Sequence, residues 1–199
     1  TAGSTSGVRE GESLPLGELM YGLLLPSGND ASVALGEHVG SRFEPAEGSE
    51  TDSLSRFIAE MNREAEALGL KETHFANTHG LTAEGHHTSA RDLASLAAKC
   101  LQDPLFAKVV STSRRGCTLR GPDKSTRNVV WENTNNLLGI EGYTGVKTGT
   151  TSAAGACLVA SGERGDTSRI VVILGASSSP GRYVDARNLF RWAWQQVNP

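Results

Sequence analysis

The sequence predicts an α+β fold, in which a helical first half precedes an antiparallel sheet and one final helix. Up to residue 110, hydrophobic residues recur at helical spacing. After Ser111 the period becomes that of short strands between Gly-, Ser- and Asp-rich turns, and from Arg182 it is helical again. We therefore expect two parts of one domain: a mainly helical lobe over residues 1–110, and a sheet with its C-terminal helix over residues 111–199.

The first half begins with a Gly-, Ser- and Thr-rich stretch over residues 1–12, which predicts a surface loop. Helices are then expected wherever leucines and other apolar residues lie three or four positions apart. Capping residues mark several of their ends, such as Ser89 before one helix and Gly69 after another. The five expected helices are 15–25, a second opening at Ser27, 54–68, 90–101 and 104–110.

The second half contains short runs of β-branched and aromatic residues bounded by turn residues. A Gly-Pro-Asp turn separates the first two runs, and this predicts a hairpin. The last three runs are linked closely enough for an antiparallel meander. The expected strands are 117–120, 128–131, 143–149, 154–161 and 169–175, and the last helix then follows from Arg182.

Composition excludes several classes of protein. The chain has 199 residues, of which 38% are hydrophobic and 21% charged, a balance typical of a globular protein and not of a disordered one. A net charge of -3 gives no general attraction to nucleic acid. No apolar run approaches the ~20 residues of a membrane-spanning helix. The three cysteines lack metal-ligand spacing, so we expect neither a zinc site nor a disulfide scaffold.

Ser27-Gly28-Asn29 follows Pro26 at the junction of two predicted buried helices. A short rigid turn there can direct polar side chains into a cleft. The alternative is structural, because Ser and Asn are also the residues that cap a helix N-terminus. By itself, the S-x-N motif does not decide between these interpretations.

Lys147-Thr148-Gly149 ends a predicted strand. Gly149 would let a ligand lie close to the backbone, and Lys147 could bind a carboxylate. The alternative is an ordinary edge strand protected by a lysine. The order S-x-N and then K-T-G, however, repeats the second and third parts of the S-x-x-K, S-x-N, K-T-G set of serine penicillin-binding proteins and β-lactamases.

Longer segments extend this similarity over nearly the whole chain, in the same order as in one family. The chain resembles the low-molecular-mass penicillin-binding proteins, which are serine-type D-alanyl-D-alanine carboxypeptidases. The resemblance implies a β-lactamase/penicillin-binding transpeptidase-like fold. The segments that carry it are Leu23–Ala31, Thr73–Asn77 with Gly80-Leu81, Thr88–Leu93, Asn133–Leu138, Gly142–Thr151 and Ala153–Gly155.

The nucleophile motif of that family is missing from the sequence. No serine stands three residues before a lysine; Ser95 to Lys99 is one residue too long, and Thr144 precedes Lys147 on a predicted strand. We expect an upstream segment of the same protein to carry S-x-x-K. The alternative is a natural chain that has lost this segment.

The resemblance assigns roles to the first motif and to Lys147. Activated serine nucleophiles need a neighbouring base, and the oxyanion that forms needs N–H donors already in place. Ser27 would relay a proton to and from the leaving group, and Asn29 would hold the substrate amide and the missing lysine. Lys147 would supply positive charge beside Ser27 and the substrate carboxylate.

The resemblance also assigns the carboxylate and oxyanion contacts. Thr148 would donate a hydrogen bond to the terminal carboxylate, with Gly149 leaving room for the substrate. Thr150 would offer its backbone N–H to the oxyanion. Arg182 matches an arginine that attracts the carboxylate, although an arginine at a helix start is often simply solvated.

The resemblance implies that the enzyme trims peptidoglycan pentapeptides through an acyl-enzyme and is acylated by β-lactams, without a metal or cofactor. It implies a place in the cell envelope, outside the cytoplasmic membrane. Two other functions remain open: a non-catalytic peptidoglycan-binding homologue and a serine β-lactamase. A cluster of histidines, His74, His79, His86 and His87, would suggest a zinc hydrolase, but the H-E-x-x-H motif is absent.

Overall fold

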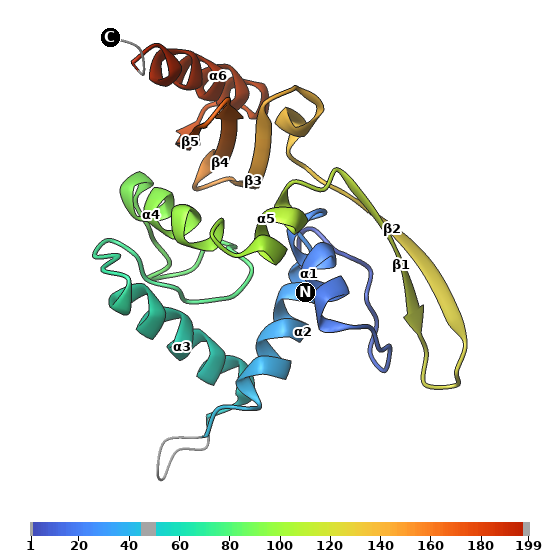
Figure 1. Ribbon diagram of the computed structural model, residues 1–199. Coiled ribbons are helices and arrows are strands. Elements are labelled where there is room, and N and C mark those ends of the chain that lie inside the picture. Colours follow the sequence, from blue (N-terminus) through green and yellow to red (C-terminus); the bar gives the residue numbers. More distant parts are fainter. Residues whose placement is uncertain (1, 45–50, 197–199) are drawn as a thin grey trace. The chain divides into compact units, whose positions relative to one another are not determined.

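The computed structural model describes residues 2–44 and 51–196, and Figure 1 traces their helices and strands. The chain forms two compact units. The first unit combines Thr1–His87 with Arg114–Glu132, and the second combines Thr88–Ser113 with Asn133–Pro199. Each unit is therefore built from two separate stretches of the sequence.

Three helices form most of the first unit. Helix α1 begins directly after Pro15, whose fixed φ suits a helix start. The Asp52 carboxylate caps α3 by accepting a hydrogen bond from the backbone N–H of Ser55, and Gly69 follows the helix with φ of +72°. The bounds are Leu16–Leu24 for α1, Asn29–Gly40 for α2 and Ser53–Ala67 for α3.

A two-stranded antiparallel hairpin completes the first unit. Its strands are β1, Arg114–Arg120, and β2, Thr126–Glu132. Trp131 is 2% exposed and donates from its indole N–H to the Ser6 carbonyl at 2.8 Å. The indole packs closely on Gly22 of α1, because a Cβ added to Gly22 would lie only 3.0 Å from the ring. The hairpin is thus part of the same core as α1.

The second unit is a three-stranded antiparallel sheet with helices on both faces. Its strand order is β3-β4-β5, so β3 and β5 are the edges. Figure 1 shows α6 over one face and α4 on the other. The elements are α4 (Ala90–Cys100), α5 (Pro104–Val110), the 3₁₀ helix η1 (Asn136–Gly139), β3 (Tyr143–Thr151), β4 (Gly155–Arg164), β5 (Thr167–Ala176) and α6 (Ser179–Gln195).

The core of the second unit lies between α6 and the sheet. Alternate residues of β4 and β5, such as Leu158 and Val171, point toward α6, as expected for strands whose side chains alternate between faces. Phe190 is fully buried at its centre. Its ring lies 5.2 Å from that of Tyr143 and 4.9 Å from that of Trp194, measured between centroids. An aromatic cluster therefore holds α6 on the sheet.

The predicted α+β class and all the predicted elements are confirmed, with shifted ends. The second helix begins at Asn29 and not at Ser27, because Gly28 has extended backbone geometry and is the N-cap. The last helix begins at Ser179, where Ser178 caps it by accepting a hydrogen bond from the Gly181 N–H. Prediction had placed that start at Arg182, one turn too late.

The two compact units also differ from the division expected at residue 110. The hairpin belongs to the first unit because Arg115 pairs with Glu18 and Arg127 pairs with Glu12. Helices α4 and α5, expected in the helical lobe, instead pack against the sheet of the second unit. Residues 2–12 contain no helix or strand, as predicted, but specific contacts described below hold them in place.

We predict that Phe190→Ala destabilises the protein by about 3–5 kcal/mol, because it removes a fully buried ring and leaves a cavity. Trp192→Ala on the same helix is the matched control. Trp192 is 61% exposed, and its loss should change the free energy of unfolding by less than about 0.5 kcal/mol. Urea unfolding followed by fluorescence measures both. Equal effects of the two variants would contradict the assigned core.

Candidate active site

The S-x-N motif lies in a strained turn between α1 and α2. Ser27 has φ of +62°, a left-handed conformation that is unfavourable for a residue with a side chain. A Cβ on Gly28 would lie 2.5 Å from the Gly22 carbonyl oxygen, so only glycine fits between the two polar residues. Backbone strain of this kind is typical of functional positions.

Neither polar residue of the motif occupies the N-cap of α2. The N-cap is Gly28, and the Asp30 carboxylate accepts a hydrogen bond from the Ala31 N–H in the first turn. Asn29 is 5% exposed, and its side-chain NH₂ donates to the Ala2 carbonyl at 2.5 Å. The buried amide of Asn29 is therefore bonded to another segment of the chain.

Asp30, next to the motif, anchors the N-terminal loop. Its carboxylate accepts hydrogen bonds from the backbone N–H groups of Ser6, Gly7 and Val8 at 2.8 to 3.2 Å, and from the Thr5 hydroxyl at 2.7 Å. Burial alone would raise the pKa of Asp30, but these donors outweigh it, and the pKa lies below its usual 3.8. This carboxylate holds the loop beside the turn that carries Ser27.

We predict that Asp30→Ala lowers the free energy of unfolding by about 3 kcal/mol, because it leaves several partly buried N–H donors without an acceptor. The folded-state pKa of Asp30 is depressed, so its stabilisation is present above pH 3.8 and is lost as pH falls below that value. Thermal unfolding from pH 3 to 7 tests both points. An effect of the substitution that does not shrink toward pH 3 would contradict the assignment.

The K-T-G motif lies on edge strand β3 of the second unit. Lys147, Thr148 and Gly149 pair with Val159, Leu158 and Cys157 of β4. Successive residues alternate between the faces, so Thr148 is buried on the α6 side, at 7% exposure, while Lys147 is on the opposite face. An edge strand can accept an extended peptide along its outer side.

Lys147 is a partly buried cation with a lowered pKa. Burial is the larger cause and the positive charge of Arg182 the smaller one, and together they lower the pKa to about 8. Its ammonium group donates to the Thr148 carbonyl at 2.7 Å. At neutral pH the lysine is thus still charged. Because it is partly buried, its charge would strongly stabilise an anion beside it.

Arg182 meets the same strand from α6. It is 7% exposed, so the interpretation of a solvated arginine is wrong. One guanidinium nitrogen donates to the Thr150 hydroxyl at 3.0 Å, to the Gly149 carbonyl at 3.2 Å and to the Cys157 carbonyl at 3.3 Å. The structure therefore brings Lys147, Thr148, Gly149, Thr150 and Arg182 together at one end of β3.

The sequence-predicted residues thus fall into two groups. Ser27 and Asn29 lie in the first unit, and the K-T-G group with Arg182 lies in the second. The family resemblance implies that both groups line one groove, and this stays a prediction. Asp30, Thr134 and Tyr183 were not assigned a role from the sequence, although Asp30 and Thr134 fall within the segments that resemble the family.

The histidines make backbone contacts. The Nδ1 atoms of His74 and His87 both lie within 3.0 Å of the Gly85 carbonyl oxygen. His86 Nδ1 accepts a hydrogen bond from the Ala76 N–H at 3.0 Å, and burial lowers the pKa of its imidazole. Across residues 2–44 and 51–196, no group of three or more potential metal ligands was found.

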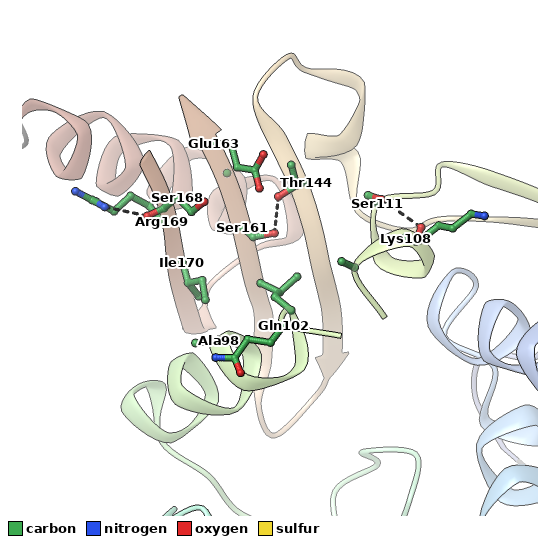
Figure 2. Close-up of a pocket in the computed structure, with 13 residues that line it drawn as sticks. Ala98, Gln102, Lys108, Ser111, Thr144, Ser161, Glu163, Ser168, Arg169 and Ile170 are labelled. Carbon is green, nitrogen blue, oxygen red and sulfur yellow. Dashed lines mark hydrogen bonds between the residues drawn. The ribbon is translucent and has the colours of Figure 1, made fainter. Parts of the chain in front are cut away.

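A cavity of about 620 Å³ lies between the sheet and helices α4 and α5 (Figure 2). Thr144 and Ser161 line it, with their hydroxyls 2.9 Å apart, and so do Lys108 and Arg169. Neither motif contributes a side chain to its lining. We therefore locate the candidate chemistry at the end of β3 and not in this cavity.

We predict that Lys147 titrates near pH 8 in the folded chain. Its folded-state pKa is lower than the usual 10.5, so burial of its charge destabilises the fold below about pH 8 and this cost is relieved as pH rises further. Arg182→Gln should move the titration upward, because the positive charge of Arg182 lowers this pKa. NMR of ¹³C-labelled lysine, assigned with Lys147→Ala, measures it. A Lys147 signal that titrates near 10.5 would contradict the burial of this side chain.

Comparison with known proteins gives one consistent result. Residues 1–178 match the sequence model of a family described as "D-alanyl-D-alanine carboxypeptidase". The chain is 38% identical to the D-alanyl-D-alanine carboxypeptidase DacD of Escherichia coli over 190 residues, which are 94% of this chain and 44% of that protein. It is 37% identical to DacF of Bacillus subtilis, over 98% of this chain and 46% of the relative.

Solved structures give the same result. The crystal structure of the Streptomyces K15 DD-transpeptidase matches with a TM-score of 0.89 at 31% identity, over 97% of this chain and 72% of the other. The D-alanyl-D-alanine carboxypeptidase DacD of Francisella tularensis matches with a TM-score of 0.81 at 28% identity, over 98% of this chain and 55% of the other. The chain thus spans less than half the length of the curated relatives named above.

Proposed function

Because this chain belongs to the D-alanyl-D-alanine carboxypeptidase family, we propose that it is the core of a serine-type enzyme that removes the terminal D-Ala from peptidoglycan stem peptides through an acyl-enzyme. One observation supports this most directly. Two positive charges, Lys147 and Arg182, lie at the end of an edge strand, where Lys147 donates to the Thr148 carbonyl and Arg182 donates to the Thr150 hydroxyl. Such a group suits a peptide that ends in a carboxylate.

The proposed chemistry needs a nucleophile from outside these 199 residues. An S-x-x-K serine in another segment of the protein attacks the peptide carbonyl, while its lysine takes the proton. Ser27 relays a proton to the leaving D-Ala, and Asn29 orients the substrate amide. The Thr150 backbone N–H stabilises the oxyanion. The strained backbone of Ser27 is consistent with a turn maintained for function.

The carboxylate-binding group has its own part in this reaction. Thr148 donates to the terminal carboxylate, Gly149 lets the peptide lie against β3, and Lys147 and Arg182 attract the negative charge. Binding at this end fixes the scissile bond relative to the nucleophile, and such positioning lowers the barrier to acyl transfer.

The proposed partners are peptidoglycan pentapeptides, β-lactams that acylate the same serine, and the segment that carries S-x-x-K. We propose a location in the cell envelope, where this substrate lies. Among the helices of residues 2–44 and 51–196, none combines the length and the apolar character that a membrane span requires.

The test is covalent labelling with a fluorescent penicillin. We predict that the complete protein is labelled on the serine of its S-x-x-K segment, and that the 199-residue chain is not, because none of its serines has a lysine at the required spacing. Mass spectrometry identifies the modified residue. Substitution of that serine by alanine in the complete protein is the control.

Other outcomes would overturn the proposal. A stable adduct on a serine of the isolated chain would mean that the nucleophile has been misassigned. A folded complete protein that is not labelled would favour a non-catalytic peptidoglycan-binding homologue. Fast hydrolysis of the penicillin, with release of product, would instead favour a serine β-lactamase.

A further inference from the structure

The loop before η1 places a threonine directly against the K-T-G motif. Thr134 belongs to neither motif. Its hydroxyl oxygen lies 2.6 Å from that of Thr148, which is a short hydrogen bond between two hydroxyls. Thr148 is 7% exposed, and Thr134 is the partner found for its hydroxyl among the described residues. The orientation of the Thr148 hydroxyl is therefore controlled largely by Thr134.

A buried tyrosine on α6 connects Thr134 with Arg182. The Tyr183 hydroxyl donates to the Thr134 carbonyl at 3.0 Å, and it lies 3.3 Å from both the Asn136 N–H and a guanidinium nitrogen of Arg182, which donate to it. A phenol oxygen has one hydrogen to donate and two lone pairs to accept with, so all of its capacity is used. The Arg182 guanidinium also lies over the Tyr183 ring, 4.9 Å from its centroid.

The chemistry of a carboxylate determines which hydroxyl must donate. An ionised carboxylate only accepts hydrogen bonds, and a threonine hydroxyl has a single hydrogen. If Thr148 donates that hydrogen to the substrate, it can only accept from Thr134. The Thr134 hydroxyl must then be the donor of the 2.6 Å bond.

We propose that Thr134 and Tyr183 are positioning residues for recognition of the substrate carboxylate. Thr134 donates to the Thr148 hydroxyl and so directs the hydrogen of Thr148 toward the substrate. Tyr183 holds Thr134 from one side and the Arg182 guanidinium from the other. This inference rests on the proposed function, because it assumes that Thr148 and Arg182 bind a terminal carboxylate.

The test compares two reagents that differ in the carboxylate alone. The complete protein and its variants react with benzylpenicillin and with its methyl ester, and mass spectrometry gives the acylation rate constant for each. Thr134→Val should lower the rate with benzylpenicillin about tenfold, as expected for a lost charge-assisted contact, and change the rate with the ester less than twofold. Thr134→Ser keeps the hydroxyl and should restore the selectivity for the carboxylate.

Two further variants complete the design. Tyr183→Phe should reduce the same selectivity, because it removes the hydroxyl that holds both Thr134 and Arg182. Thr118→Val is the matched control: it removes an exposed threonine hydroxyl that bonds to Asn128 on the hairpin, so both rates should stay within twofold of the original protein.

The outcomes separate this inference from the proposed function. If Thr134→Val slows both reagents equally, or slows neither, the positioning role is wrong while the proposed function stands. If Thr134→Ser behaves as Thr134→Val does, the role of the hydroxyl is wrong. If the original complete protein is acylated by neither reagent, the proposed function fails, and this inference fails with it.

Discussion

The buried positive charge of Arg182, whose hydrogen-bond partners are neutral oxygens, is the constraint on which the candidate carboxylate site depends. Within the described residues, the hydrogen-bond acceptors found for Arg182 are carbonyl and hydroxyl oxygens, and no acidic side chain pairs with it. A buried charge needs such partners to offset its lost hydration. The guanidinium therefore ties the first turn of α6 to the ends of β3 and β4, and it leaves the region positively charged. Burial lowers the pKa of Lys147, and the positive charge of Arg182 lowers it further.

The first unit maintains its motif by different means. Ser27 has an unfavourable backbone conformation, and Gly28 is crowded by the Gly22 carbonyl. Neither feature stabilises the fold by itself. The stabilising contribution comes from Asp30, whose carboxylate binds a loop that is more than 20 residues distant in sequence. A strained turn can persist only where surrounding contacts of this kind hold it.

The sequence predicted the positions of the helices and strands better than it predicted their ends. Helix and strand positions followed from apolar spacing, because each element buries one face. The ends of the helices were predicted less accurately. Apolar spacing predicted that the last helix begins at Arg182, but Ser178 is its N-cap and Pro180 lies in its first turn, so the helix begins about one turn earlier. The Ser89 cap of α4 was simpler to predict, since a serine beside the helix start makes a local hydrogen bond.

The sequence by itself determined the fold class, the two motifs and the family, because these depend on local spacing and on short runs of residue types. It could not reveal the burial of Arg182, the lowered pKa of Lys147 or the link from Thr148 through Thr134 to Tyr183. Only the tertiary structure decided these. They arise from hydrogen bonds and charges between residues 14 to 49 positions apart, which meet because α6 packs on the sheet. Distances in space, and not the order of residues, control solvation and hydrogen bonding.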